Sequence, residues 1–238
     1  MSESILKNSK YHLIRKISEN TLSNILLVEF EGKQYVLKSL KSSNPDVIQR
    51  FRRESSTLAR LSHPNLVKLI DASEQDGQPY LVMEYLEGQT LTAKLAAEKS
   101  LSEEYSLKIV TSITEALTEI HKNNLLHRDI KPGNIMLSTK GVQLIDLGLI
   151  GDIEQIKTET ALVGTPLYCS PEQTKILKRD MGFSSDLYSL GIVFFEMLTG
   201  APPFTGSLND ILQQHTSTPV PNLRLLKPGL RESTYRHQ

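Results

Sequence analysis

The sequence predicts an α+β fold of two lobes, a small β-rich N-terminal lobe with one helix and a larger helical C-terminal lobe. Up to about residue 85 the chain consists mostly of short β-rich segments. From Leu91 onward, apolar residues recur at the spacing of helices. The 238 residues are enough to bury a substantial core. We therefore expect a tail at 1–10, an N-terminal lobe at 11–85, a C-terminal lobe at 86–227 and a polar tail at 228–238.

The N-terminal lobe is expected to contain five strands and one helix. The strands are predicted at 11–17, 24–30, 34–40, 66–72 and 79–84. Glu31-Gly32-Lys33 joins the second strand to the third as a hairpin turn, and the polar segment 74–77 joins the last two. Pro45 opens the helix, which runs to about Leu61 and is stopped by His63-Pro64-Asn65.

Long helices are expected in the C-terminal lobe. Ser102 caps a helix that runs to about Asn123, with its apolar face formed by Leu107, Val110, Ile113, Leu117 and Ile120. Ser184 or Ser185 caps a second, apolar helix that ends at Gly200, and a short helix follows at 207–215. The loop-rich stretch 125–183 between the long helices carries most of the motifs.

Composition excludes several classes of protein. Lys and Arg number 27 and Asp and Glu number 27, so the net charge gives no reason to expect nucleic acid or an anionic membrane as a partner. The single Cys169 excludes an internal disulfide framework and fits a reducing compartment. The N-terminus has no apolar signal core, and the apolar run 187–198 is too short for a membrane span. We expect a soluble cytoplasmic domain.

The most informative motif is His127-Arg128-Asp129-Ile130-Lys131-Pro132-Gly133-Asn134. It groups an acid, a lysine and an amide within six positions. The alternative is a polar loop in which Pro132 only forms a turn. That alternative is weak because further motifs occur in a fixed order along the chain: Lys38 in a strand, Glu54 on the next helix, Asp146-Leu147-Gly148, Gly164 to Gln173, and Asp186. Each of these alone has an ordinary interpretation, such as a solvent-facing strand lysine or a common turn.

Over about residues 10–215 these motifs together resemble the eukaryotic-like Ser/Thr protein kinases, especially their bacterial branch. The resemblance implies that Asp129 accepts or orients the proton of the attacking hydroxyl and that Lys131 neutralises charge on the phosphoryl group. Asn134 and Asp146 would bind Mg²⁺ (or Mn²⁺), which prefers oxygen ligands.

The resemblance also assigns the remaining catalytic side chains. Lys38 would contact the α- and β-phosphates, with Glu54 as its ion-pair partner. Thr165 would contact Asp129 and Lys131, and this pairing indicates Ser/Thr specificity rather than Tyr. His127 and Cys169 are expected to be packed structural residues.

ATP is expected in the cleft between the lobes. By the resemblance, Met83 is the gatekeeper and the backbone of Glu84 and Leu86 contacts adenine. The remaining residues expected at the nucleotide are apolar: Ile17, Ile25, Val36 and Met136.

Two further features depend on the resemblance. Thr158 and Thr160 lie where many bacterial kinases of this type autophosphorylate, and a phosphate there would pair with Arg128; the alternative is a solvated loop. Asp186 would anchor the backbone of the catalytic loop, or serve only as a first-turn carboxylate of its helix.

The sequence departs from the family pattern in two places. Ser18, Asn20 and Ser23 occupy the three positions of the glycine-rich loop, so weakened ATP binding or turnover is expected. The chain also ends soon after the 207–215 helix, so Glu172 lacks an obvious Arg partner and apolar surface of the 187–198 helix is expected to be exposed. The chain would then be a truncated product, a fragment, or a domain completed by self-association or by a partner.

Three functions remain open at this point. The first is an ATP-dependent Ser/Thr protein kinase that acts on protein hydroxyls. The second is a non-catalytic, kinase-like module that binds nucleotide or protein, which the degenerate loop favours. The third is a small-molecule kinase, against which the segment from Gly164 to Gln173 argues because it resembles a platform for peptide substrates.

Overall fold

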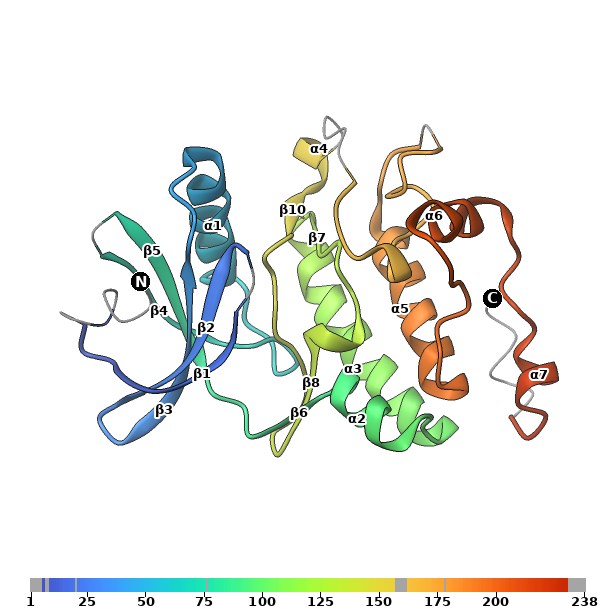
Figure 1. Ribbon diagram of the computed structural model, residues 1–238, viewed down its shortest axis with the longest axis horizontal. Coiled ribbons are helices and arrows are strands. Elements are labelled where there is room, and N and C mark those ends of the chain that lie inside the picture. Colours follow the sequence, from blue (N-terminus) through green and yellow to red (C-terminus); the bar gives the residue numbers. More distant parts are fainter. Residues whose placement is uncertain are drawn as a thin grey trace. The chain divides into compact units, whose positions relative to one another are not determined.

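The computed structural model describes residues 6, 9–19, 21–75, 77–156, 162–177 and 179–230. The described residues form two compact units. The first extends to Glu87 and includes 146–148, and the second comprises Gly88–Ile145 and the chain from Leu149 onward. The predicted α+β class, with a β-rich N-terminal part and a helical C-terminal part, is confirmed (Figure 1).

The first unit is an antiparallel five-stranded sheet with the strand order β1-β2-β3-β5-β4. Its strands are β1 (His12–Glu19), β2 (Ser23–Phe30), β3 (Lys33–Leu40), β4 (Leu69–Gln75) and β5 (Gln78–Glu84). One helix, α1 (Pro45–Leu58), packs against β5 and β4. Asn44 caps it by accepting a hydrogen bond from the Asp46 amide, and Pro45 occupies the first turn, where no amide donor is needed.

The second unit is mostly helical. Its helices are α2 (Leu91–Glu98), α3 (Glu103–Lys122), α4 (Ile153–Ile156), α5 (Phe183–Thr199), α6 (Leu208–Ser217) and α7 (Leu223–Leu226). The core of the unit forms where α3 packs on α5, which Figure 1 shows side by side in green and orange. The side chains of Ile113, Leu117 and Val193 are fully buried there.

Short strands and turns of the second unit carry the motifs. A three-stranded sheet has the order β6-β8-β9, and a two-stranded sheet pairs β10 with β7. Their bounds are β6 (Gly88–Thr90), β7 (Leu125–Leu126), β8 (Ile135–Ser138), β9 (Gly141–Leu144) and β10 (Gly151–Asp152). Two 3₁₀ turns, η1 (Pro132–Asn134) and η2 (Pro166–Tyr168), lie in the loops. All of these elements are only two to four residues long, too short for a periodic pattern to predict.

Several sequence-based details were wrong. The fourth strand starts at Leu69 and continues to Gln75, which pairs with Gln78 of the next strand. Neither Ser184 nor Ser185 caps α5: the N-cap is Gly182, whose amide donates to Ser185 Oγ at 3.3 Å. Leu107 is 37% exposed, because the buried face of α3 runs through Ser106, one position earlier.

The expected apolar exposure of the helix at 187–198 is small. Leu187 of α5 is exposed, as is Phe183, the first residue of the same helix. The other large apolar residues of this stretch are half-buried or buried, among them Leu190, Ile192, Val193, Phe195 and Met197. No helix in the part of the chain that the structure describes is long and apolar enough to span a membrane.

Candidate active site

The register of the five-stranded sheet determines which side chains accompany Lys38. Lys38 pairs with Ile25 on β2 and with Leu81 on β5, and Val36 pairs with Met83. Cross-strand partners lie on the same face of a sheet, and residues two positions apart share that face. Ile25, Val36, Lys38 and Met83 therefore line one face. The opposite face carries the buried cluster of Tyr11, Leu26, Val28, Leu37, Tyr80 and Val82.

Lys38 lies between two carboxylates within the first unit. Its Nζ is 2.7 Å from Glu54 Oε1, on α1, and 3.0 Å from Asp146 Oδ1. Glu54 is almost fully buried, whereas the Asp146 side chain is 44% exposed. The structure thus brings together three residues that are separated by up to 108 positions in the sequence.

Burial and charge act in opposite directions on this cluster. Burial alone would lower the pKa of Lys38, but the attraction of Asp146 and Glu54 outweighs it and leaves the pKa above its ordinary value. Burial raises the pKa of Glu54; Lys38 offsets part of this increase, and the negative charge of Asp146 adds to it. Two carboxylates share one ammonium group, so the lysine remains charged, while burial disfavours the ionised form of Glu54.

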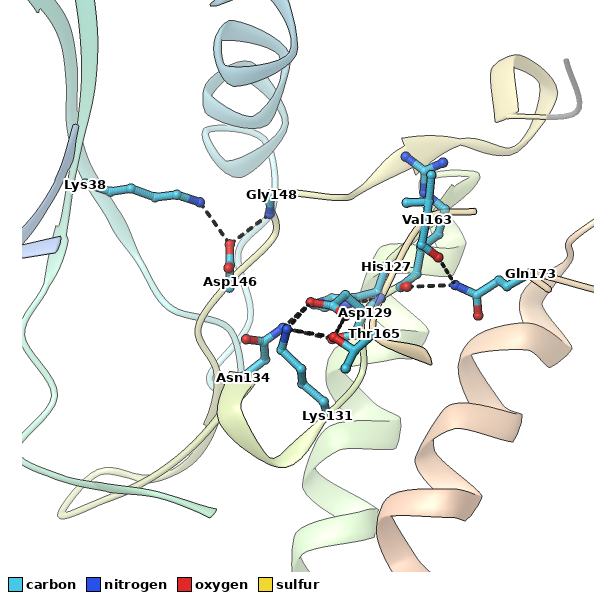
Figure 2. Close-up of polar contacts among 11 residues, drawn as sticks. Lys38, His127, Asp129, Lys131, Asn134, Asp146, Gly148, Val163, Thr165 and Gln173 are labelled. Carbon is cyan, nitrogen blue, oxygen red and sulfur yellow. Dashed lines mark hydrogen bonds and ion pairs between the residues drawn. The ribbon is translucent and has the colours of Figure 1, made fainter. Parts of the chain in front are cut away.

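Gly148 completes this arrangement. Its amide donates a hydrogen bond to Asp146 Oδ1 at 2.9 Å, so the same oxygen accepts from Lys38 and from the backbone (Figure 2). A Cβ at Gly148 would lie 3.1 Å from both Asp146 Oδ1 and Lys38 Nζ. A side chain at this position would therefore require Asp146 or Lys38 to shift by a few tenths of an ångström.

The other residues predicted to contact the nucleotide lie in several different structural elements. Ile17 is exposed on β1, where the pairing with β2 is irregular between Lys16 and Ser18. Glu84 ends β5, and its amide donates to the Lys68 carbonyl at 3.0 Å, while Leu86 is buried just beyond. Met136 belongs to β8 of the second unit, where it pairs with Thr90 and Gln143.

In the second unit, Asp129 is the centre of a hydrogen-bonded group. Thr165 donates to Asp129 Oδ1 at 2.7 Å. Lys131 Nζ lies 2.7 Å from Oδ2, and Asn134 Nδ2 donates to the same oxygen at 3.0 Å. Lys131 also donates to Thr165 Oγ1 at 2.9 Å, so one lysine bridges the hydroxyl and the carboxylate (Figure 2).

The contacts among the described residues do not use every hydrogen-bond acceptor position of the Asp129 carboxylate. A carboxylate offers about four acceptor positions, two on each oxygen. Among the contacts of the described residues, Lys131 and Asn134 occupy both positions of Asp129 Oδ2, and Thr165 occupies one position of Oδ1. One position on Oδ1 remains for an incoming hydroxyl group.

The loop that carries Asp129 is fixed from α5. Asp186 Oδ2 accepts from the His127 amide at 2.9 Å, and its Oδ1 accepts from the Arg128 amide at 2.8 Å. His121 of α3 contacts Asp186 Oδ2 at 2.8 Å as well. Asp186 is both a first-turn residue of α5 and the anchor of this loop. His127 is fully buried, and its Nδ1 accepts from the Asp129 amide at 3.2 Å.

The segment around Thr165 is held by side chains that sequence reasoning missed. His215 of α6 contacts the Pro166 carbonyl through Nε2 at 3.0 Å and the Tyr188 hydroxyl through Nδ1 at 2.9 Å. Tyr168 donates to Glu196 Oε2 at 2.8 Å. Burial raises the pKa of Glu196 and lowers that of His215. No local pattern marks these residues, because each looks like an ordinary helix or loop position.

Three other predicted features have different outcomes. Thr158 and Thr160 lie outside the described residues. Cys169 is buried, and burial raises its pKa to about 12, so its thiol remains protonated at neutral pH. Glu172 Oε2 is buried and has no hydrogen-bond partner among the described residues.

The fold and these arrangements are those of the protein kinases, and the chain belongs to the protein kinase domain family: the family model described as "Protein kinase domain" matches residues 11–234. The chain is 33% identical to Serine/threonine-protein kinase PrkC of Bacillus subtilis over 95% of its length. It is 34% identical to Probable serine/threonine-protein kinase PknB of Lactococcus lactis over 94%, and 37% identical to Serine/threonine-protein kinase PknB of Mycobacterium tuberculosis over 86%.

These comparisons confirm the resemblance to bacterial Ser/Thr kinases that the motifs indicated. The matched regions cover 36%, 37% and 34% of the three relatives, so the chain spans about a third of the length of the curated relatives it matches.

Proposed function

We propose that this chain transfers the γ-phosphoryl group of ATP to Ser or Thr hydroxyls of proteins. The observation that carries the proposal is the Asp129 carboxylate, which Thr165, Lys131 and Asn134 hold with one acceptor position left on Oδ1. A hydroxyl that donates to this position has its oxygen oriented for attack. The relatives are named serine/threonine-protein kinases, which supports the same activity.

In the proposed reaction the substrate oxygen attacks the γ-phosphorus, and the bond from that phosphorus to the β–γ bridging oxygen breaks. ADP leaves with the electron pair of this bond, and Asp129 takes up the hydroxyl proton. Lys131 compensates charge on the phosphoryl group, and Lys38, oriented by Glu54, would hold the α- and β-phosphates. The apolar face of the sheet around Ile25 and Val36 supports binding of the adenine ring.

Asn134 and Asp146 would hold a divalent metal ion, and their surroundings fit that role. Asn134 Nδ2 donates to the carbonyl and the carboxylate of Asp129, which orients its amide oxygen away from them. Asp146 remains substantially exposed although Lys38 and Gly148 hold Oδ1. Mg²⁺ suits such a pair, since it is commonly bound by one or two protein oxygens together with substrate phosphates. The ion, Mg²⁺ or Mn²⁺, would neutralise charge on the transferring group.

The loop without glycines supports weakened rather than abolished transfer. Neither Ser18 nor Ser23 has a positive φ, so the described parts of this hairpin do not need the conformational freedom of glycine. Asn20 lies outside the described residues. The added side chains would keep the backbone farther from the phosphates, and one lost donor can cost about 3 kcal/mol. A kinase-like module that binds without catalysis is the alternative function.

The test is phosphate transfer from γ-labelled ATP with Mg²⁺ to the chain itself and to a generic Ser/Thr acceptor. Asp129→Asn should remove almost all transfer while a fluorescent ATP analogue still binds. Asp180→Asn makes the same charge change at an exposed site and should leave transfer intact. Transfer that persists in Asp129→Asn, or no transfer by the folded natural chain, would contradict the proposed activity.

We further propose protein substrates, self-association and a cytoplasmic location for this chain. Exposed Phe183 and Leu187 of α5 support a protein contact, which sedimentation at several concentrations would test.

A further inference from the structure

Gln173 is buried in the second unit and uses its whole amide group. It is 1% exposed. Its Nε2 donates to the Arg128 carbonyl at 2.8 Å and to the Val163 carbonyl at 3.0 Å, while its Oε1 accepts from the Ser170 amide at 3.0 Å. Figure 2 shows the hydrogen bond from the Gln173 amide to the Val163 carbonyl. A buried amide with both donors satisfied by two separate loops fixes the distance between those loops.

The two carbonyls flank the groups of the proposed reaction. Arg128 directly precedes Asp129, and Val163 lies two positions before Thr165. Between Val163 and Thr165, Gly164 has φ +104°. A Cβ at Gly164 would lie 2.5 Å from the Arg128 carbonyl oxygen and 3.0 Å from Gln173 Nε2. The two loops therefore meet backbone to backbone at Gly164, and Gln173 spans their contact.

Arg128 itself needs support, since it has a φ of +68°, which non-glycine residues rarely adopt. Asp186 accepts from its amide at 2.8 Å, and Gln173 donates to its carbonyl. Both polar groups of this backbone residue are thus held by buried side chains. A shift of Arg128 would move Asp129, because the two are adjacent in the chain.

We propose that Gln173 is a positioning residue that sets the contact between Asp129 and Thr165. It does so by holding the Arg128 and Val163 carbonyls at a fixed separation. The role rests on the proposed phosphoryl transfer, and it predicts a loss of turnover and of acceptor binding with no change in nucleotide binding. Misplacement of reacting groups by about 1 Å can cost on the order of 100-fold in rate.

Gln173→Met and Gln173→Glu test the role while keeping the length of the side chain: methionine removes both donors, and glutamate carries one donor only when it is protonated. Gln173→Met should lower kcat by about 10- to 100-fold, with the dissociation constant of a fluorescent ATP analogue unchanged. Gln213 is exposed on α6, so Gln213→Met and Gln213→Glu are matched controls that should retain kcat.

Gln173→Glu adds a pH readout that a merely structural role would not produce. An ionised carboxylate would face two carbonyl oxygens, whereas a protonated one can donate to one of them. The kcat of Gln173→Glu, divided by that of Gln173→Met, should therefore rise as the pH falls from 8 to 6. The charged groups nearby, Arg128, Asp129 and Asp186, are common to both variants, so the ratio reports the introduced carboxyl group.

A readout independent of activity separates this proposal from the proposed function. In ¹H–¹⁵N spectra, Gln173→Met should shift the backbone amide signals of Asp129 and Thr165, and Gln213→Met should not. If the natural chain transfers no phosphate, these spectra still decide the role of Gln173. Unshifted signals, unchanged kcat in folded Gln173→Met, or equal losses of nucleotide binding and of turnover would overturn it.

Discussion

Replacing Lys38 by Met should destabilise the protein more than replacing Glu54 by Gln, because the two ends of this ion pair have different numbers of partners. Lys38 contacts Glu54 at 2.7 Å and Asp146 at 3.0 Å. Among the described residues, Lys38 is the cation that faces Glu54, whose side chain is only 6% exposed. Lys38→Met leaves a buried carboxylate without a counterion, whereas Glu54→Gln leaves Lys38 paired with Asp146.

The magnitudes follow from burial. Removing one partner of a buried pair typically costs about 3–5 kcal/mol, and we expect about 3 kcal/mol for Lys38→Met because Glu54 can take up a proton. Glu54→Gln retains an acceptor for Lys38, so about 1 kcal/mol is expected. The double variant should cost about 2 kcal/mol, less than the sum of the single changes, which gives a coupling energy of about 2 kcal/mol.

The pH dependence provides an internal check. Burial raises the folded-state pKa of Glu54 above its ordinary value, so the folded protein holds this proton more tightly than the unfolded chain. A protonated Glu54 needs no counterion. The destabilisation by Lys38→Met should therefore be largest above the raised pKa and decrease as the pH falls toward 4.5, the ordinary value for Glu.

The assay is urea unfolding followed by circular dichroism, which suits a chain that has no Trp. Lys33→Met, at an exposed position of the same strand, is the matched control and should cost under about 0.5 kcal/mol. A Lys38→Met variant as stable as Glu54→Gln, or a double variant whose cost equals the sum of the single costs, would refute the reasoning.

Two further predictions concern the supports of the catalytic loop and of the Thr165 segment. Asp186→Asn places an amide nitrogen against backbone donors, so it should lower the free energy of unfolding by about 2 kcal/mol; a loss under about 0.5 kcal/mol would contradict the anchoring role. His215 contacts the Tyr188 hydroxyl, the Pro166 carbonyl and the Phe204 ring, and burial lowers its pKa below 6.5. Below pH 6.5 the unfolded chain binds this proton more readily, so the natural protein should lose stability on acidification to pH 5.5 more steeply than His215→Gln. Melting temperatures measured at both pH values test this, and parallel slopes would argue against it.

The fold class and the order of the chemical groups along the chain were predictable from the sequence. Apolar periodicity marked the long helices, and β-rich segments marked the strands of the N-terminal sheet, because such patterns arise within single elements. The spacing in His127 to Asn134 likewise placed an acid, a lysine and an amide on one short loop.

The contacts that hold these groups in place depend on the tertiary fold and could not be predicted from the sequence. The hydrogen bond from Gln173 to the Arg128 carbonyl joins residues 45 positions apart, and the one from His215 to Pro166 spans 49. Ser106 rather than Leu107 lies on the buried face of α3, because the packing against α5 selects the face. A single polar residue gives no periodic signal, and whether it is a solvated side chain or a buried support depends on which backbone groups the fold brings beside it.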